Sequence, residues 1–350
     1  MPHKIPYCAR PWASLMLYPD RAGPECALSD RINCPIEGKT WEDIWNSEQM
    51  KYIRTTVLND QEETLGCKTC EYYGSESVFY EELTVLINNL EAQRNFCLNK
   101  EEFFAGNILL TSKPIAVSAD ISYKCNFKCL MCELILDAKE MDSSNLNNLF
   151  QILTKSTVHL HISGGEPLMH KGFVHYLEFP NATPSILSIT TNGSLLKRNI
   201  LENLKFFSGV NLHISIDSFS QDVFSRMRPG SNPHDILNNL NHAVRMKNEL
   251  KNTDNCKSWY ICLQFLPCIL NINEFPSYIS KSSNLGIDEI QVCEISGNYP
   301  QYDFIKNPAL LRDTNIKLLV KEIKSAIAKY PKLEFTGVEN LISKLESSIV

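Results

Sequence analysis

The feature that most constrains the fold of this chain is an alternation of β-like and helical segments that begins at about Ala116. Six short runs rich in apolar and β-branched residues are separated by segments with helical periodicity. The runs cover residues 115–122, 158–163, 186–191, 211–218, 259–266 and 288–295. Strands that alternate with helices pair in parallel and carry the helices outside the sheet. The alternation therefore predicts an α/β fold, a partial (β/α)6 barrel of the TIM type, with its chemical groups at the carboxyl ends of the strands.

Four unusual loops stand where that rule places the chemistry. The sequence CNFKCLMC puts Cys125, Cys129 and Cys132 directly after the first predicted strand, and SGGEP, TTNG and ISIDS end the next three. Three cysteines are an odd number for a metal site, because structural zinc takes four ligands and disulfides need an even count. A zinc knuckle whose fourth ligand is not apparent is the simpler alternative for this loop.

The C-x3-C-x2-C spacing, joined to G-G-E-P at the next strand end, resembles the radical S-adenosylmethionine (radical SAM) enzymes over residues 116–293. The resemblance implies that Cys125, Cys129 and Cys132 bind three irons of a [4Fe–4S] cluster and leave the fourth iron open for SAM. It also implies the reaction. An electron from the cluster cleaves SAM, and the resulting 5′-deoxyadenosyl radical abstracts hydrogen from a substrate.

The same resemblance assigns residues to SAM. Gly164, Gly165 and Glu166 correspond to the segment that meets the SAM ammonium group through backbone carbonyls and a side chain, and glycine suits close backbone approach. Met131 stands before the last cluster cysteine, where an aromatic residue is common, and is assigned to cover the adenine. Asn192 is assigned a further polar contact, although an Asn-Gly dipeptide is also an ordinary turn.

Ser215 and Asp217 alternate along the fourth predicted strand, so both are expected to point into the barrel, where the resemblance places ribose-binding residues. Arg228, in the sequence RMRPG, corresponds to the basic residue that pairs with the SAM carboxylate, a contact that suits a guanidinium. Two simpler interpretations stay open: Asp217 as the cap of the following helix, and Arg228 as an ordinary surface residue.

A second cysteine set precedes the predicted barrel. CARPWASLMLYPDRAGPEC, then WEDIWNSEQMKYIR, then CKTC is similar to the twitch domain, a shortened SPASM domain, here placed before the barrel rather than after it. The resemblance implies that Cys8, Cys26, Cys67 and Cys70 ligate a second, auxiliary [4Fe–4S] cluster that carries electrons. Zinc competes for this site, because four cysteines with a terminal C-x2-C also suit a tetrahedral zinc ion.

Two segments near the second cysteine set predict helices. In TWEDIWNSEQMKYIRTTV, apolar residues such as Trp41, Trp45 and Met50 recur at helical spacing, and Thr40 suits the N-cap. SVFYEELTVLINNLEAQRN, residues 77–95, predicts a linker helix.

Two of the remaining cysteines are assigned a role. Cys268 and Cys293 lie in or near the last two predicted strands, on faces that Gln264 and Gln291 share if the strands stay regular, and are candidate hydrogen-atom donors to a substrate radical. A buried, unreactive thiol is the simpler interpretation of both. The same interpretation is the default for the rest, which are Cys34, Cys97, Cys256 and Cys262. Two strand histidines are expected to be structural or to line a cavity, His161 and His213.

Composition excludes several classes of protein. The formal net charge of −6 argues against a nucleic-acid-binding surface. No signal peptide is apparent at the start, and proline and polar residues break the longest apolar stretches before they could cross a bilayer. Thirteen cysteines, gathered in clusters, indicate metal or redox chemistry in a reducing compartment. A cytoplasmic protein that binds neither nucleic acid nor membrane is expected.

These observations predict three parts: a twitch-like domain over residues 1–75, a helical linker over 76–112, and a radical SAM partial barrel with a C-terminal helical segment over 113–350. The expected function is hydrogen abstraction from a peptide or protein, leading to oxidation or crosslinking, with an electron donor such as flavodoxin or ferredoxin. Dehydrogenation or epimerisation of a sugar or another small molecule is the alternative. A zinc-stabilised binding module without enzyme activity is a more remote one.

Overall fold

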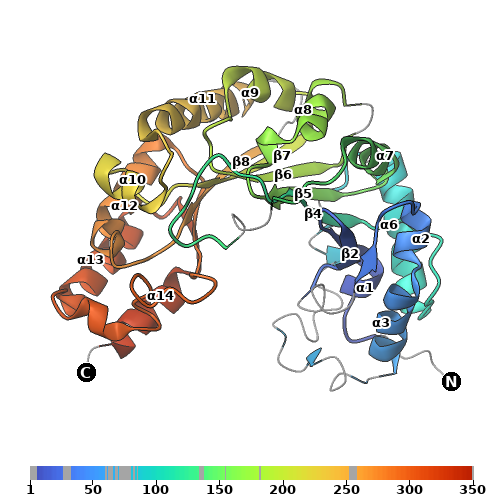
Figure 1. Cartoon of the computed structure of the whole chain (residues 1–350), viewed down its shortest axis with the longest axis horizontal. Coiled ribbons are helices and arrows are strands. Elements are labelled where there is room, and N and C mark those ends of the chain that lie inside the picture. Colours follow the sequence, from blue (N-terminus) through green and yellow to red (C-terminus); the bar gives the residue numbers. More distant parts are fainter. Residues whose placement is uncertain are drawn as a thin grey trace. The chain divides into compact units, whose positions relative to one another are not determined.

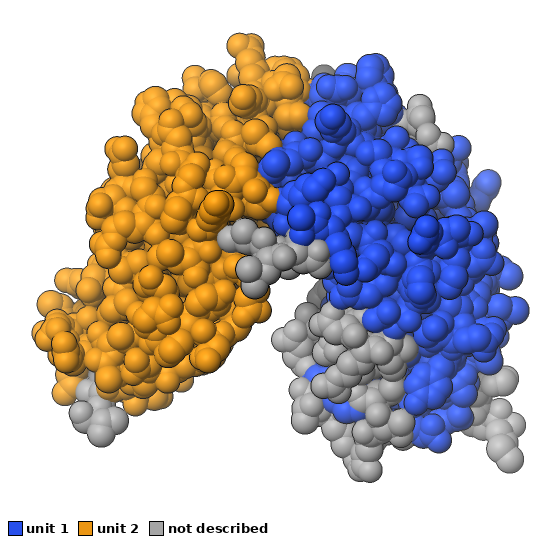
Figure 2. Space-filling model, viewed as in Figure 1, with its two compact units in different colours: residues 1–124, 137–189, 203–210 blue, residues 125–136, 190–202, 211–350 orange. Residues whose placement is uncertain are grey.

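The computed structural model describes residues 6–26, 33–59, 61, 66–67, 70, 80–81, 83–84, 86–133, 138–153, 155–180, 183–251 and 258–348, so Cys256 lies outside the described residues. The chain forms two compact units (Figure 2). Unit 1 consists of residues 1–124, 137–189 and 203–210, and unit 2 of residues 125–136, 190–202 and 211–350. Each unit contains parallel strands connected through helices, so the fold is mixed α/β (Figure 1).

Unit 1 contains the N-terminal strands and the first of the predicted barrel strands. Its elements are α1 (Arg10–Ala13), β1 (Ser14–Leu17), β2 (Arg21–Pro24), β3 (Cys34–Pro35), α2 (Trp41–Trp45), α3 (Glu48–Leu58), α6 (Leu90–Phe104), β4 (Ala116–Ser122), α7 (Ser143–Leu153), β5 (His159–Gly164), the 3-10 helix η3 (Pro167–Met169) and α8 (Lys171–Glu178). The chain passes between the units within β6 (Ile186–Thr191), α9 (Arg198–Leu204) and β7 (Gly209–Ser215).

Unit 2 contains the later strands and the C-terminal helices. Its elements are α10 (Gln221–Met227), α11 (Pro233–Lys251), β8 (Ser258–Phe265), η4 (Ile272–Glu274), α12 (Phe275–Leu285), β9 (Glu289–Val292), η5 (Pro308–Leu311), α13 (Ile316–Lys329), β10 (Glu334–Thr336) and α14 (Val338–Ser347).

The strand order is β6-β5-β4-β1-β2-β3 in unit 1 and β7-β8-β9-β10 in unit 2. The pairs among β4, β5 and β6 are parallel, as are those among β8, β9 and β10. The six predicted strands are all present, as β4 to β9. β10 is an addition, because its three residues are too few to show a periodic pattern.

The N-terminal strands join the sheet of unit 1. β1 pairs in parallel with β4, with Met16 opposite Ser118, and β2 and β3 follow by antiparallel pairing. The segment assigned to a twitch-like domain thus extends the sheet that begins with the first barrel strands. The domain boundaries at residues 75 and 112 stay predictions.

Alternate residues of a strand face opposite sides of the sheet, and the two sides differ in chemistry. In β4, Ala119 and Ile121 are fully buried, whereas Ser118 and Asp120 occupy the other face. Asp120 accepts a hydrogen bond from the hydroxyl of Ser163 in β5 at 2.5 Å. The strands therefore pack one face in the core and leave the other face to polar side chains, which is where a site can form.

The segment predicted as one amphipathic helix forms two. Thr40 caps α2 through a capping box, as its position predicts, but that helix ends after five residues and α3 restarts with Ser47 as its N-cap. At the break, the Asn46 side chain binds the backbone carbonyl and N–H of Leu110 at 2.8 and 3.0 Å. A side chain that satisfies two distant backbone groups explains why the helix stops there.

The predicted linker helix is interrupted: residues 80–81 and 83–84 are helical, and a break at residues 86–89 precedes α6. α6 begins at Leu90 with Asn89 as its N-cap, so residues 87–89, predicted to be helical, are not. α6 packs into unit 1: the Phe103 and Trp12 ring centroids lie 5.6 Å apart, and Asn99 donates to the Trp12 carbonyl oxygen at 2.6 Å. Across the described helices, none combines the length and apolar character of a membrane span.

Candidate functional site

The loop with the sequence CNFKCLMC is held by the backbone around Arg228. Lys128 donates its N–H to the Pro229 carbonyl oxygen at 3.0 Å, and Leu130 donates to that of Met227 at 2.9 Å. The loop carries three partly exposed thiols, those of Cys125, Cys129 and Cys132. Main-chain hydrogen bonds therefore fix the cysteine loop to the segment that follows α10.

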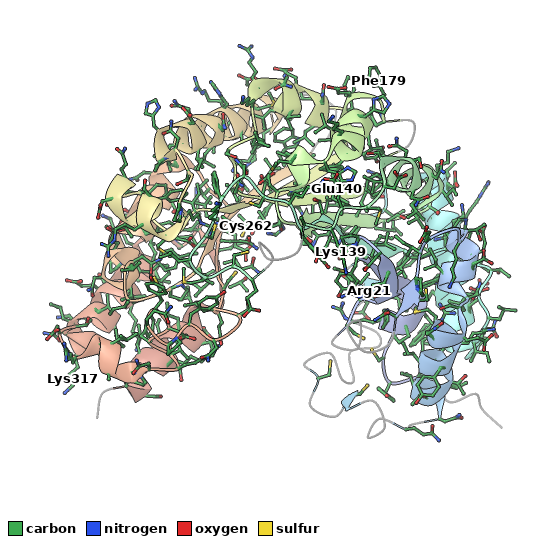
Figure 3. The ribbon with its side chains drawn as sticks, in the orientation of Figure 1. Arg21, Lys139, Glu140, Phe179, Cys262 and Lys317 are labelled. Carbon is green, nitrogen blue, oxygen red and sulfur yellow. The ribbon has the colours of Figure 1, made fainter. Side chains whose placement is uncertain are left out.

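The two ends of this loop meet in unit 1. Tyr123, just before the loop, donates its backbone N–H to the Lys139 carbonyl oxygen at 2.9 Å. Asp20 in turn binds the Lys139 ammonium at 3.0 Å and the Arg21 guanidinium at 3.2 Å, two residues marked in Figure 3. The chain thus leaves β4 and returns at neighbouring points, which closes the loop at its base.

The glycines of SGGEP are required by the neighbouring strand. A Cβ atom on Gly164, whose φ is +116°, would lie 2.3 Å from the Ser122 carbonyl oxygen, and one on Gly165 would lie 2.2 Å from that of Lys124. Glu166 is fully buried, and its carboxylate accepts the backbone N–H two residues further on at 3.1 Å. Close packing against the end of β4 and the residues just after it therefore explains both glycines. The assignment of all three residues to SAM stays a prediction.

Asn192, at the end of β6, contacts the cysteine loop itself. Its Nδ2 donates to the Oδ1 of Asn126 at 2.9 Å and lies 3.8 Å from the Cys125 sulfur, while its Oδ1 accepts the Ser194 N–H at 2.9 Å. The turn that the Asn-Gly dipeptide predicts is present, and the assignment of Asn192 to SAM stays a prediction. The sequence did not single out Asn126, although this residue directly follows the candidate ligand Cys125.

Arg228 and Asp217 bind each other. Arg228 Nε donates to Asp217 Oδ2 at 2.6 Å, and Arg228 Nη1 lies 3.7 Å from the Cys129 sulfur. The side chain of Arg228 is only 14% exposed, so its interpretation as a surface residue is wrong. The interpretation of Asp217 as a helix cap is also wrong, because the N-cap of α10 is Ser220.

Electrostatics couple the three thiols to this ion pair. Burial raises the pKa of Cys129 to about 11; Arg228 opposes the rise, and the thiolates of Cys125 and Cys132 add to it. Burial alone would lower the pKa of Arg228, but Asp217 and Cys129 outweigh burial and raise that pKa. The three thiols thus lie within electrostatic range of one another, with one cation facing the middle cysteine.

Ser215 belongs to a row of polar side chains in unit 2. Its hydroxyl donates to Gln264 Oε1 at 3.3 Å, and Gln264 Nε2 donates to Gln291 Oε1 on β9 at 3.0 Å. One step earlier along the strands, Cys262 (Figure 3) stands opposite Glu289. Burial and the Glu289 carboxylate both raise the pKa of the Cys262 thiol. The row presents amide and hydroxyl groups, as the alternation along β8 and β9 predicts.

Met131 and Cys268 lie in one buried cluster of unit 2, together with Met227 and Ile295. The Cys268 side chain is 0% exposed and its sulfur is 3.9 Å from that of Met227, whereas Cys293 is partly exposed. Met131 therefore packs inside the protein, and its assignment to the adenine stays a prediction. Three of the described cysteines are expected to be unreactive and buried. Cys34 and Cys262 are buried, whereas Cys97 is exposed.

The N-terminal cysteines lie in unit 1. All four have partly exposed side chains, namely Cys8, Cys26, Cys67 and Cys70. Burial raises the pKa of Cys8 to about 11, and the thiolates of Cys67 and Cys70 add to that rise. Arg10, two residues after Cys8, pairs at 3.7 Å with Glu25, which directly precedes Cys26. Electrostatic interactions thus connect Cys8 with Cys67 and Cys70, and the Arg10–Glu25 ion pair connects the segments that carry Cys8 and Cys26.

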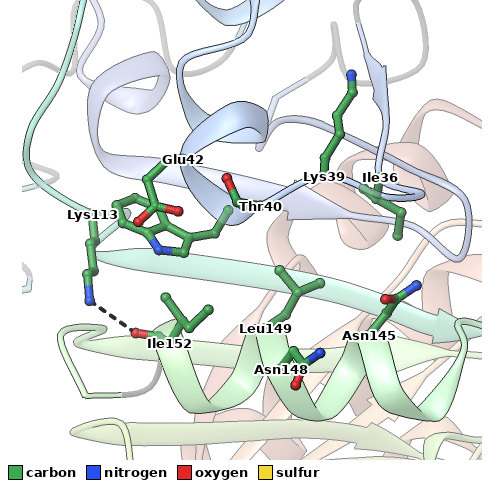
Figure 4. Close-up of a pocket in the computed structure, with 10 residues that line it drawn as sticks. Ile36, Lys39, Thr40, Glu42, Lys113, Asn145, Asn148, Leu149 and Ile152 are labelled. Atoms are coloured by element: carbon green, nitrogen blue, oxygen red, sulfur yellow. Dashed lines mark hydrogen bonds between the residues drawn. The ribbon is translucent and has the colours of Figure 1, made fainter.

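A hollow of about 560 Å³ on unit 1 is lined by none of the residues assigned to SAM or to a cluster (Figure 4). Side chains of α2 and α7 line it, together with Lys113. The Lys113 ammonium lies 5.3 Å from the centroid of the Trp41 ring and donates to the Ile152 carbonyl oxygen at 3.4 Å. The Lys113 ammonium group is therefore already engaged by the protein.

Comparisons with known proteins identify the central part of the chain. Residues 120–256 match the profile of the Radical SAM superfamily. A GTP 3′,8-cyclase of Alkaliphilus oremlandii is 30% identical over 131 residues, 35% of this chain and 41% of the cyclase. A PqqA peptide cyclase of Bradyrhizobium diazoefficiens is 23% identical over 211 residues, 59% of this chain and 52% of that protein. The crystal structure of Streptococcus suis SuiB bound to S-adenosylmethionine aligns with a TM-score of 0.48 at 16% identity, over 84% of this chain and 62% of that chain.

The chain spans about half, or less, of the length of these two curated relatives, both of which are named as enzymes. The matched region contains the three cysteines of the loop and the motifs that end β5, β6 and β7. Over residues 120–256, this chain carries a domain of the radical SAM superfamily.

Proposed function

We propose that this chain is a radical SAM enzyme that abstracts hydrogen from a peptide or protein, which it oxidises or crosslinks. The observation that supports the proposal is the surroundings of the cysteine loop. Three partly exposed thiols share one closed loop, and Arg228 and Asn192 direct N–H groups at two of the sulfurs. Hydrogen bonds to the ligand sulfurs are a feature of iron–sulfur sites.

The donor set fits a [4Fe–4S] cluster better than a single metal ion. Within the described ranges, no three His, Cys, Asp or Glu side chains stand close enough to share one ion. A cluster binds each thiolate through a different iron, so Cys125, Cys129 and Cys132 need not converge on one point. A zinc knuckle requires that convergence. With SAM on its open iron, the cluster would supply the electron that cleaves SAM to a 5′-deoxyadenosyl radical.

The unit 2 residues assigned to SAM differ in how much of their hydrogen-bonding capacity other protein groups already use. Ser215 is already a donor to Gln264, but its oxygen can still accept a hydrogen bond from a ribose hydroxyl. Asp217 and Arg228 are engaged with each other at 2.6 Å, so a SAM carboxylate would compete with Asp217 for the guanidinium.

The strand faces support a peptide more than a nucleotide substrate. No lysine or arginine occurs within β4, β5, β6, β7, β8, β9 or β10, and phosphate groups are usually bound by these residues. The row formed by Ser215, Gln264 and Gln291 offers hydroxyl and amide groups that match the donors and acceptors of peptide bonds.

Small-molecule chemistry is the second candidate, and the 30% identity to the GTP 3′,8-cyclase favours it. This class includes the dehydrogenation or epimerisation of a sugar. Titration of the reconstituted protein with GTP tests whether the substrate is a nucleotide. Saturable binding at micromolar concentration would favour the nucleotide, and absence of binding is expected if the strands accept a peptide.

The proposal extends to an auxiliary [4Fe–4S] cluster on the N-terminal cysteines. The electrostatic coupling of Cys8 to Cys67 and Cys70 supports a shared site. Four thiolates also suit zinc in their chemistry, although no three of these described side chains stand close enough to share one ion. Analysis for acid-labile sulfide and zinc decides between them. An electron donor such as flavodoxin or ferredoxin, and the reducing cytoplasm in which free thiols persist, complete the proposal.

The direct test needs no substrate. Anaerobically reconstituted protein with a reductant and SAM should slowly form 5′-deoxyadenosine. Cys129→Ala should form none, because an incomplete cluster cannot pass an electron to SAM. Cys97→Ala, which removes an exposed thiol on α6, is the matched control and should keep the original rate. Protein that binds zinc without acid-labile sulfide, and yields no 5′-deoxyadenosine, would favour the non-enzymatic binding module.

A further inference from the structure

Arg228 stands between a buried carboxylate and a proposed cluster ligand. Its Nε donates to Asp217 Oδ2 at 2.6 Å, and its Nη1 lies 3.7 Å from the Cys129 sulfur. The other oxygen of Asp217 accepts the backbone N–H of Leu266 at 3.0 Å. The guanidinium is therefore anchored through one N–H and offers another to the thiol.

The backbone fixes this arrangement from both sides. Met227 and Pro229 flank Arg228 in the sequence, and their carbonyl oxygens accept the N–H groups of Leu130 and Lys128 at 2.9 and 3.0 Å. Leu130 and Lys128 flank Cys129 in the same way. The distance between the guanidinium and the sulfur is thus set mainly by these backbone hydrogen bonds, and the arginine side chain spans the gap that they leave.

We infer that Arg228 raises the reduction potential of the cluster by donating a hydrogen bond to the Cys129 sulfur, and that Asp217 limits this effect. The inference rests on the proposed function, because it takes Cys129 as a cluster ligand. Hydrogen bonds to the sulfurs and the net charge nearby both set the potential of an iron–sulfur cluster. A cation beside the thiolate stabilises the reduced cluster, which carries one more negative charge, and the carboxylate acts in the opposite sense.

This role differs from pairing with the SAM carboxylate, because it operates before SAM binds. Asn192 provides an internal comparison. It offers the Cys125 sulfur an N–H at 3.8 Å but carries no charge. Removing the Asn192 amide should therefore shift the potential in the same direction as removing the guanidinium, and by less.

The test is a redox titration of the reconstituted, SAM-free cluster followed by electron paramagnetic resonance. At a fixed solution potential, Arg228→Met should lower the ratio of reduced to oxidised cluster about tenfold, which is about 59 mV for one electron. Asp217→Asn should raise the same ratio, because the guanidinium charge is then uncompensated. Arg228→Lys, which keeps the charge but not the guanidinium geometry, should fall between Arg228→Met and the unmodified protein.

Opposite shifts for the two partners are not expected from a purely structural role. Asp288→Asn is the matched control, because Asp288 pairs with buried Lys247 at 2.7 Å, and it should leave the potential unchanged. If Arg228→Met loads no iron, the remaining comparison of Asp217→Asn with Arg228→Lys still decides by its sign. Unchanged potentials with weakened SAM binding would overturn the inference and return Arg228 to the SAM carboxylate. Failure of the unmodified protein to form any cluster would instead overturn the proposed function.

Discussion

Cys268 and Cys293 are the two thiols that the sequence offers as hydrogen donors, and they have different surroundings. Burial raises the pKa of each thiol to about 11, so both keep their S–H hydrogen at neutral pH. Cys268 is enclosed with Met131, whereas Cys293 is partly exposed and lies within electrostatic range of Arg228 and its partner Asp217. Exposure, rather than acidity, therefore favours Cys293 as the donor.

Alkylation of the metal-free protein tests this difference without a substrate. Because the two pKa values are similar, the exposed thiol should react first with iodoacetamide. Peptide mass spectrometry should find Cys293 modified while Cys268 stays protected until the protein is unfolded in urea. Equal rates for the two would show that the buried cluster around Cys268 opens readily, and would restore it as a candidate.

At the scale of one element, α6 is anchored by its last turn. The Glu102 carboxylate accepts the backbone N–H and the hydroxyl of Thr111 at 2.7 and 2.6 Å, and those of Ser112 at 3.1 and 2.5 Å. Burial alone would raise the pKa of Glu102, but the bonds from Ser112 and Thr111 outweigh burial and lower it. The ionised carboxylate thus joins α6 to the segment that leads into β4.

Glu102→Gln should lower the free energy of unfolding near neutral pH by roughly 1–3 kcal/mol, because charge-assisted hydrogen bonds are lost. The pKa of Glu102 is lower in the folded than in the unfolded protein, so its contribution is complete above its ordinary pKa of 4.5 and is lost as the pH falls through the folded value. Urea unfolding should show a large difference from the unmodified protein near pH 7 that shrinks as the pH falls below 4.5. A difference independent of pH would rule out the ionised carboxylate as its cause.

At the scale of the whole molecule, the two cysteine sets belong to different units. The N-terminal set belongs to unit 1 and the cysteine loop to unit 2. The separate placement predicts independent loading. Reconstituted protein should bind about eight irons, four for each cluster. The triple variant Cys125→Ala, Cys129→Ala, Cys132→Ala should keep about half of them. Iron and acid-labile sulfide analysis provides the measurement, and a triple variant that loses all iron or none would contradict two independent clusters.

The same separation predicts that the N-terminal cluster is not needed for SAM chemistry. Cys67→Ala should spare SAM binding and the slow formation of 5′-deoxyadenosine, since the cysteine loop has its own thiols. It should abolish turnover of the true substrate if the auxiliary cluster takes an electron from the substrate radical. Parallel assays of 5′-deoxyadenosine and of substrate product make the comparison. Full turnover by the variant would favour a redox-neutral reaction with hydrogen return from a thiol.

The sequence by itself determined the features that depend on neighbouring residues. Strand periodicity placed β4 to β9, because burial on one face imposes a local alternation of side chains. The cysteine loop and the SGGEP motif were equally visible, since each is a contiguous segment that follows a strand. Thr40 as a cap was predictable for the same reason, because a capping box spans only four residues.

Tertiary structure alone decided the contacts between distant segments. The pairing of β1 with β4 joins residues about a hundred positions apart, and the buried Arg54 at the end of the WEDIWNSEQMKYIR motif binds the carbonyl oxygens of Pro11 and Ile108. Likewise, no local pattern shows that Arg228 binds Asp217 and faces Cys129, which lies 99 residues away. Periodicity and motifs report which face a residue occupies. Which charged group finds which partner depends on how the packed elements bring their side chains together, because a buried charge is stable only beside the groups that compensate it.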